Sequence, residues 1–264
     1  MTEFMKPNIT VEQVGENIAR FVMEPLERGY GQTLGNGMRR VLLSSLDGAA
    51  ATAIKIEGVQ HEFTSAPGVV EDVTDIVLNI KGLVFAPFAG GEEATATLSA
   101  QGPCVVTGAD LEVPTEFQLI NPDHVIATLS EGAQLEMSVR IGVGRGYVPA
   151  ERNKQAIIEK NDINTLPVDS IYTPVLKVNY NVESTRVGQA IDYDKLTIEV
   201  WTDGTINAQE AVSLAARVLT EHLNLFVNLS DEAAGTEIMV EKTNDDKEKA
   251  LEMTIEELDL SVRS

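Results

Sequence analysis

The sequence predicts an α+β fold, because segments with helical periodicity and segments with strand periodicity follow one another along its 264 residues. Apolar residues recur at helical spacing over 34–46, 69–81 and 207–229, and short runs that alternate apolar and polar residues fill much of 83–145. Two further alternating runs follow Pro167. The chain is long enough for one large domain or two small ones, each able to bury its own core.

The composition limits the class of function. A protein that binds nucleic acid directly usually does so through clustered lysine and arginine, and here the formal net charge is -21. Any polynucleotide contact must therefore be local or come from partners. Cys104 is the only cysteine, which excludes an intrachain disulfide and indicates a reducing cytoplasm. The N-terminus does not resemble a signal peptide, and no apolar run could cross a membrane, so we expect a soluble, cytoplasmic protein.

The first elements follow from local patterns. Residues 18–25, IARFVMEP, are an apolar run closed by proline and predict a strand. A helix over 34–46 stops near Asp47 and Gly48, and residues 50–57 alternate with the period of two expected for a half-exposed strand. The next segment, 69–81, is an amphipathic helix, with apolar residues at Val69, Val73, Ile76, Val77 and Ile80.

The helix predicted over 34–46 has two different faces. The side that a helix would bury is formed by Leu34, Met38, Val41, Leu42 and Ser45. The opposite side carries Asn36, Arg40 and Leu43. A leucine beside a forked guanidinium is typical of a surface that binds another protein, although Arg39 and Arg40 are also compatible with ordinary helix polarity.

The middle of the chain predicts a β-rich module. Between about 83 and 145, short alternating runs such as ATATLSA and LEMSVRIGV are separated by Gly-Gly, Gly-Pro and Asn-Pro turn signals. The segment GVGRGYVPAERN, 142–153, is basic and rich in glycine, and the polar stretch that continues to Asn164 indicates an exposed loop. Strands are then predicted at VLKVNYNV, 175–182, and KLTIEVWT, 195–202.

A long helix begins at Asn207, which forms a capping box with Glu210 in which the asparagine oxygen accepts from the N3 amide. The helix should reach about residue 229, a length of roughly 30 Å. Apolar residues cover close to half of its circumference, more than one small sheet can bury, and this pattern is typical of a dimer interface. Residues 230–250 are acidic and favour a flexible linker, and residues 251–264 regain helical spacing as the start of another domain.

Enzymatic interpretations of the remaining motifs are weaker. The glycines from Gly29 to Gly37 fit neither common phosphate-loop spacing, and no lysine follows the last one, so tight turns and close helix packing are favoured over phosphate binding. His61, His124 and His222 have no second ligand at metal-binding spacing, and we expect no metal or cofactor. His222 is placed on the apolar side of the long helix, as a hydrogen-bonded core or interface residue.

Three acids of the second predicted helix, Glu71, Asp72 and Asp75, could be imagined as a pair of acid and base catalysts. They lie on its polar face near its N-terminus, where the helix dipole favours negative charge. A solvated face is the preferred interpretation, and contact with a basic partner is the alternative.

Several long segments together make the chain resemble the bacterial DNA-directed RNA polymerase alpha subunit. The resemblance runs in the family's order and nearly from end to end, through FVMEPLERGYGQTLGNGMRRVLLSSL (21–46), HEFTSAPGVVEDVTDIVLNIKGL (61–83), INPDHVIATL (120–129), GRGYVPAERN (144–153), the stretch 167–206 and TIEELDLSVRS at the C-terminus. Residues 83–123 match weakly.

The resemblance implies an N-terminal domain of two subdomains and only the start of the family's C-terminal DNA-binding domain. A discontinuous dimerisation subdomain, an antiparallel sheet with helices, would comprise 1–48 and 169–229. A β-rich subdomain would be inserted at 49–168, followed by a linker at 230–250 and the truncated domain at 251–264. In the family the two helices of each copy form the dimer, which here implies Tyr30, Leu34, Met38, Val41, Val212, Ala215, Leu219, Leu223 and Phe226.

The resemblance also implies partners. The family's arginine pair falls on Arg39 and Arg40 and is associated with docking of the beta subunit, together with Asn36 and Leu43 on the same helix. The expected function is a homodimeric assembly platform for beta and beta-prime, with omega in the core enzyme and sigma in the holoenzyme. Such a chain is a subunit of a nucleotidyltransferase without an active site of its own, and it contacts DNA only through its C-terminal domain. The competing hypothesis is a free-standing nucleotide-binding enzyme that uses the glycines as a phosphate loop.

Overall fold

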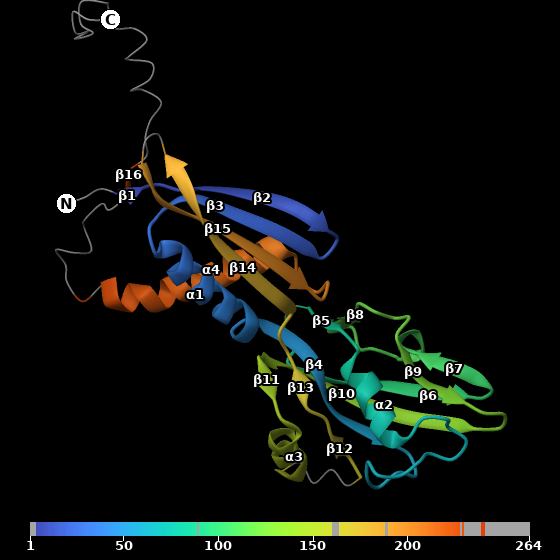
Figure 1. Ribbon diagram of the computed structural model, residues 1–264. Helices are drawn as coiled ribbons and strands as arrows, with labels where there is room; N and C mark the ends of the chain where they lie inside the picture. Colours follow the sequence, from blue (N-terminus) through green and yellow to red (C-terminus); the bar gives the residue numbers. More distant parts are fainter. Residues whose placement is uncertain are drawn as a thin grey trace, which may run out of the picture.

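The computed structural model describes residues 4–88, 90–159, 164–187, 190–227, 229 and 239–240. Within these ranges the chain forms two lobes (Figure 1). We call them the terminal lobe, built from the segments up to residue 46 and from 174 onward, and the central lobe, 47–173. Antiparallel sheets and four helices make up the two lobes, which confirms the predicted α+β class.

The terminal lobe is a four-stranded antiparallel sheet covered on one face by two helices. The order is β14 (Val175–Val187), β15 (Ala190–Thr202), β3 (Ile18–Glu27) and β2 (Asn8–Gly15). Helices α1 (Tyr30–Ser44) and α4 (Ala208–Val227) pack on it through a core that includes Phe21, Leu42, Leu196, Ala211 and Ala215. The predicted strand and helix types are therefore found, and segments from both ends of the chain share one sheet.

Helix α1 can lie close to the sheet because two glycines face it. A Cβ atom on Gly31 would come within 2.6 Å of Val182 Cγ1, and one on Gly35 within 2.6 Å of Tyr180 Cδ2. Both distances are shorter than any ordinary carbon contact, so larger residues would push the helix away from β14. Glycine here serves close packing, as the sequence indicated.

The central lobe is built around a six-stranded sheet. The strands are β6 (Glu93–Gln101), β10 (Gln134–Arg145), β4 (Asp47–Ile56), β5 (Phe85–Pro87) and β8 (Phe117–Leu119), with β12 (Leu166–Pro167) pairing with β4. Helix α2 (Val73–Lys81) and the pair of β7 (Cys104–Thr107) with β9 (Val125–Leu129) enclose a second apolar core that includes Ile54, Ile76 and Ile126. A 3-10 turn, Gly108–Asp110, follows β7.

A small appendage lies along one side of the central lobe. It consists of the two-stranded pair β11 (Tyr147–Val148) and β13 (Ser170–Ile171) with helix α3 (Ala150–Glu159). The sequence predicted an exposed loop over much of α3, and this was wrong. Helix α3 buries only Ile157, so its apolar pattern is too weak to signal a helix.

Several predicted boundaries also differ. Helix α1 begins at Tyr30, not at residue 34, and α2 begins at Val73, not at 69, because Val69 forms a bridge with Leu129 in the extended segment before it. Strand β2 had no counterpart in the prediction. At the start of α4 the Asn207 side chain does cap the helix, but it accepts from the N2 amide of Gln209 at 3.0 Å.

The predicted linker and C-terminal segment fall almost entirely outside the described residues. Only the pair Met239–Val240 is described there. Met239–Val240 forms β16, which pairs in parallel with β1 (Phe4–Met5). The interpretations of 230–250 as a flexible linker and of 251–264 as the start of a domain stay predictions.

Candidate protein-binding surfaces

The N-terminus of α1 is occupied by a carboxylate of the protein itself. Gly29 adopts a left-handed conformation with φ of 92°, which turns the chain into the helix. Its amide donates to Asp194 Oδ2 at 2.8 Å, and the amide of Gly31 donates to the same oxygen at 3.2 Å. These are the amides that a phosphate loop would offer to a ligand. Asp194, from β15, therefore holds the position that the nucleotide-binding hypothesis needs.

The outward face of α1 differs partly from the prediction. Asn36, Arg39 and Arg40 are exposed, but Leu43 is half-buried and packs against the apolar core of the terminal lobe. Among the residues that the structure describes, neither arginine has a carboxylate partner. Arg39 lines a hollow of about 700 Å³ on the terminal lobe, beside Lys195 and Glu183. Leu43 thus contributes to the base of this face, and the two cations form its accessible part.

The predicted dimer residues divide into two groups. Tyr30, Leu34, Leu223 and Phe226 are exposed, with 47%, 36%, 58% and 70% of their surface accessible. Met38, Val41, Val212 and Leu219 are half-buried. Ala215 is completely buried in the core of its own lobe, so direct contact with a second chain is excluded for this residue. Leu34 is also not in the buried stripe of α1, because Gly31 and Gly35 occupy that stripe.

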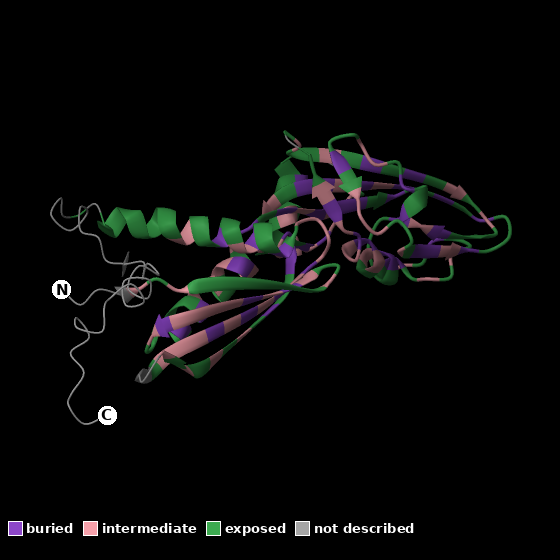
Figure 2. Cartoon of the chain, turned by 90° about the horizontal axis from the view of Figure 1, so that it is seen from above, coloured by how far each residue is buried: buried purple, intermediate pink, exposed green. Residues whose placement is uncertain are grey.

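Helix α4 has a buried first half and an exposed second half. Ala208, Ala211 and Ala215 face the lobe, whereas every described residue from Thr220 to Val227 is exposed. Figure 2 shows this outer half extending beyond the sheet. Leu223, Leu225, Phe226 and Val227 lie on it, and such a set of large apolar side chains is unusual on a solvated helix end.

A second apolar area lies on the edge of the sheet, on the face that the helices cover. In the register of β2 and β3, Val11 is opposite the buried Phe21, and Ile9 is opposite Met23, which packs against the core. Residues directly opposite in an antiparallel pair point to the same face. Ile9 and Val11 are nevertheless exposed, so the helices of one chain leave this part of the inner face uncovered.

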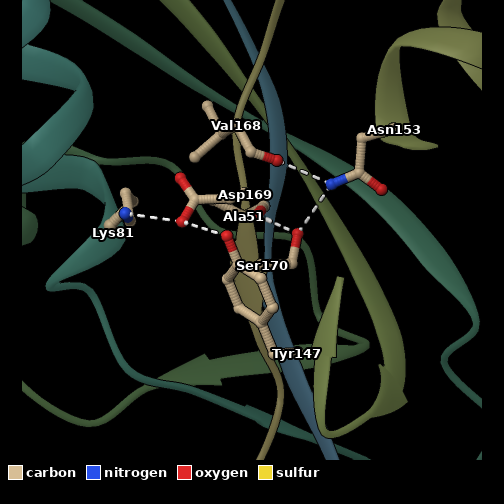
Figure 3. Close-up of polar contacts among 7 residues, drawn as sticks. All are labelled: Ala51, Lys81, Tyr147, Asn153, Val168, Asp169 and Ser170. Carbon is tan, nitrogen blue, oxygen red and sulfur yellow. Dashed lines mark hydrogen bonds and ion pairs between the residues drawn. The ribbon is translucent and has the colours of Figure 1, made fainter. Parts of the chain in front are cut away.

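In the central lobe, a set of hydrogen bonds ties the appendage to the main sheet (Figure 3). Lys81 Nζ lies 2.7 Å from Asp169 Oδ2, and the Tyr147 hydroxyl donates to the same oxygen at 3.3 Å. Asn153 Nδ2 donates to the Val168 carbonyl at 2.6 Å and to Ser170 Oγ at 3.0 Å. The buried Ser170 hydroxyl in turn donates to the Ala51 carbonyl at 2.7 Å.

The electrostatics of this cluster favour a structural role. Burial alone would raise the pKa of Asp169, but the hydrogen bond and charge of Lys81 outweigh it, and the pKa is lowered. Loss of hydration and the neighbouring Asp169 raise the pKa of Tyr147. The carboxyl group therefore stays ionised and the phenol stays protonated at neutral pH. Neither group is suited to exchange protons there.

The other candidate side chains are engaged in local contacts. Glu71 is not part of a solvated face, because its carboxylate accepts from the Thr128 amide at 2.6 Å and from the Thr128 hydroxyl at 2.8 Å. His124 Nε2 lies 2.9 Å from the Asn79 carbonyl oxygen. His222 is exposed, with Nδ1 2.8 Å from the Val218 carbonyl oxygen, so it is not a core residue. In the described ranges, no three His, Cys, Asp or Glu side chains gather in a metal-binding arrangement.

Two segments of the central lobe also carry exposed apolar side chains. In the segment 61–69, Phe63 is 83% exposed, and after Pro167 the side chain of Ile171 is exposed on β13 beside its cross-strand neighbour Tyr147. None of the described helices is both long and apolar enough to cross a membrane. The accessible features are thus apolar and cationic areas on an otherwise acidic protein.

Comparison with known proteins identifies the family. The profile of the RNA polymerase Rpb3/RpoA insert domain matches residues 54–173, which cover most of the central lobe. A DNA-directed RNA polymerase subunit alpha from Carboxydothermus hydrogenoformans is 60% identical over 264 residues, which are 100% of this chain and 83% of that protein. The chain therefore belongs to the family of bacterial DNA-directed RNA polymerase alpha subunits.

Proposed function

We propose that two copies of this chain form a symmetric dimer, and that this dimer binds the two large polymerase subunits, beta and beta-prime. Membership of the alpha-subunit family makes the chain part of a DNA-directed RNA polymerase and gives it a role in assembly of the core enzyme. The observation that carries the dimer is the outer half of α4, where Leu223 and Phe226 are 58% and 70% exposed.

The two uncovered apolar areas support a symmetric arrangement. In a twofold dimer the same surface is used by both copies, so a projecting element of one chain can cover an uncovered area of the other. The outer half of α4 projects from the lobe, and Ile9, Val11, Tyr30 and Leu34 are exposed apolar residues on β2 and α1. If the outer half of α4 of each copy packs on β2 and α1 of the other, the apolar side chains of both surfaces are removed from water. Burial of apolar surface is the main driving force of such association.

We assign docking of a large subunit to the exposed face of α1. Arg39 and Arg40 offer two guanidinium groups that can bind carboxylates with two hydrogen bonds each, and Asn36 lies one turn before Arg40. Leu43 supports this face from below. In the complete enzyme, omega and sigma would join through the large subunits, and DNA would be contacted only by a C-terminal domain. Its place of action would be the cytoplasm.

We also propose that the chain contributes no catalytic group to nucleotidyl transfer. The feature that most resembles a phosphate site is the N-terminus of α1, and its amides bind Asp194. A phosphate there would meet the negative charge of this carboxylate. The competing nucleotide-binding hypothesis expects saturable nucleotide binding by the purified chain, whereas an assembly subunit should show none in isothermal titration calorimetry.

Two phenylalanines of opposite expected effect test the dimer. Phe226 and Phe63 are both exposed, but only Phe226 lies on the projecting end of α4. Phe226→Asp should convert the dimer to a monomer in native mass spectrometry, and Phe63→Asp should remain dimeric. A parent chain that is monomeric at micromolar concentration, or a dimeric Phe226→Asp variant, would contradict the proposed interface.

A second pair of variants tests the docking face. Arg40 and Arg152 are both exposed arginines on helices, the first on α1 and the second on α3. Arg40→Ala should stay dimeric and lose capture of the beta subunit in co-purification, while Arg152→Ala keeps it. Equal capture of beta by Arg40→Ala and the parent would show that this face of α1 is not the docking surface.

A further inference from the structure

The two lobes are joined by two crossings of the chain that lie against each other. One crossing leads from α1 into β4 near Asp47 and Gly48, and the other leads from β13 into β14 through Tyr172. Tyr172 is buried, with 7% of its surface accessible, although it lies in a connecting segment. A buried aromatic residue at such a crossing requires a surface shaped to receive it.

That surface is a set of three glycines, Gly48, Gly142 and Gly144, which we call the glycine cradle. A Cβ atom on Gly144 would lie 2.8 Å from Tyr172 Cε2, and one on Gly142 would lie 3.7 Å from the Tyr172 hydroxyl oxygen. A Cβ atom on Gly48 would lie only 1.8 Å from the carbonyl oxygen of Tyr172. Gly48 and Gly144 are opposite each other in the pairing of β4 with β10.

Polar contacts hold both crossings in place around the cradle. The Tyr172 amide donates to the Gly146 carbonyl at 2.8 Å. Pro174, the first residue of the terminal lobe after this crossing, is held within that lobe by the Asp203 amide, which donates to its carbonyl at 3.0 Å, and Pro174 Cδ would lie 3.6 Å from a Cβ atom on Gly48 of the central lobe. Next to Gly48, Arg145 pairs with Asp47 through two hydrogen bonds, one of them 3.1 Å from Nη2 to Oδ2. We call the two crossings and the glycine cradle together the joint. The segment GVGRGY, which the sequence analysis noted for its glycines, is part of it.

We propose that Tyr172, seated in the glycine cradle, fixes the angle between the two lobes. The ring of Tyr172 at Gly144 and its carbonyl group at Gly48 approach the strands so closely that no side chain fits between them, and a close-packed contact of this kind resists deformation. The angle in turn sets how the α1 face and the exposed segments of the central lobe are placed relative to each other. This second step rests on the proposed function, in which a large subunit is bound by these surfaces.

The angle can be measured in the isolated chain. Cys104 is exposed on the central lobe and is the only cysteine, so one added cysteine, Thr10→Cys on exposed β2, allows a spin-label distance to be measured across the joint. Labelled chains are diluted with an excess of unlabelled Cys104→Ser chain, so that only distances within one chain are recorded. Tyr172→Ala should broaden the distance distribution at least twofold, and Tyr172→Phe should restore the parent width.

Phe63→Ala is the control for loss of an aromatic side chain, because Phe63 lies in the same lobe but is 83% exposed and outside the cradle. It should leave the width unchanged. Gly144→Ala should shift the distribution in the parent, where the new methyl group meets the ring, and should have no further effect in Tyr172→Ala. An unchanged width in Tyr172→Ala, or strictly additive effects of the two substitutions, would overturn the assignment of the joint.

The consequence for assembly is tested with the same variants. Tyr172→Ala should remain dimeric in native mass spectrometry but bind the beta subunit at least tenfold more weakly, and Tyr172→Phe should bind as the parent does. Unchanged affinity in Tyr172→Ala would overturn the link between the angle and docking. If the parent itself does not bind beta, the proposed function fails, while the distance distributions still decide whether Tyr172 fixes the angle.

Discussion

Asp169 links the appendage to α2, and its ionisation should be visible in the stability of the chain. Lys81 holds its pKa below the ordinary value of 3.8 despite partial burial. A carboxyl group whose pKa is lower in the folded chain stabilises that chain above its unfolded pKa, and the contribution is lost as the pH falls through the folded pKa. Both groups are partly exposed, so solvent screening keeps the effect small.

We expect Lys81→Gln to raise the pKa of Asp169, measured by carbon-detected NMR titration of the carboxyl group. The difference in free energy of unfolding between the parent and Lys81→Gln should be present at neutral pH. It should shrink once the pH falls below about 3.8. Lys154→Gln, which removes an exposed lysine from α3, is the matched control and should leave the pKa of Asp169 unchanged. If the pKa of Asp169 were the same in Lys81→Gln as in the parent, this account of the pair would be contradicted.

Individual residues on α1 show what a helical wheel can and cannot predict. The sequence placed Leu34 in the buried stripe and Leu43 on the outward face, yet Leu34 is exposed and Leu43 packs against the core. The wheel failed because the residues closest to the sheet are Gly31 and Gly35, which carry no hydrophobic signal. Asn36 and Arg40, which are polar, were placed on the exposed side as the pattern indicated.

At the scale of the element, two glycines of α1 should respond oppositely to the same substitution. Gly35→Ala would bring Cβ within 2.6 Å of Tyr180 Cδ2, whereas a Cβ on Gly37 meets only Leu219 at 3.9 Å. We expect Gly35→Ala to lower the free energy of unfolding by about 1–3 kcal/mol through overpacking. Gly37→Ala should raise it by up to about 1 kcal/mol through better helix propensity.

Urea unfolding at a fixed chain concentration measures both changes. The fixed concentration matters because the free energy of a dimer depends on it. Equal effects of the two substitutions would mean that close packing against β14 does not account for Gly35. The pair also explains why Gly35→Ala is a poor probe of nucleotide binding, since it would disturb the helix whether or not a ligand binds.

The elements that the sequence predicted well are those with a strong periodic pattern. β3, α2, the paired strands of 175–202 and α4 all have apolar residues at a clear period, and each is present. Helix α3 was missed because only one of its residues, Ile157, is buried, and Asn153 holds it through hydrogen bonds to Val168 and Ser170. Contacts between segments distant in sequence leave no local pattern to detect.

At the scale of the whole molecule, the stability of an assembly subunit should depend on its concentration. If the chain unfolds from a dimer to two monomers, each tenfold rise in concentration adds about 1.4 kcal/mol per dimer to its apparent stability. We expect the thermal midpoint of the parent to rise with concentration and that of Phe226→Asp to stay constant. Differential scanning calorimetry over a hundredfold concentration range tests this. A midpoint independent of concentration in the parent would argue against a dimer.

The surfaces of the molecule were predictable only in part. The excess of apolar residues on α4 predicts an interface, which stays a prediction, and Leu223 and Phe226 are exposed, as such an interface requires. The burial of Ala215 and the uncovered area at Ile9 and Val11 could not be foreseen, because both depend on where α4 crosses the sheet. The glycine cradle could not be predicted from the sequence either, because Gly48 and Gly144 are brought together only by the pairing of β4 with β10.

The discontinuous sheet of the terminal lobe has a consequence for how the chain is made. Asp194, which caps α1 at Gly29, is synthesised 165 residues after Gly29, so the cap cannot form until then. For the same reason β3 cannot pair with β15 until β15 has been synthesised. At about 5–20 residues per second, the ribosome needs roughly 8–30 s to deliver that partner. All of the central lobe emerges in this interval. A nascent chain arrested once residue 175 has left the ribosome should therefore present a folded central lobe, together with a β3 and an α1 that lack β15 and β14 and are open to chaperones and proteases.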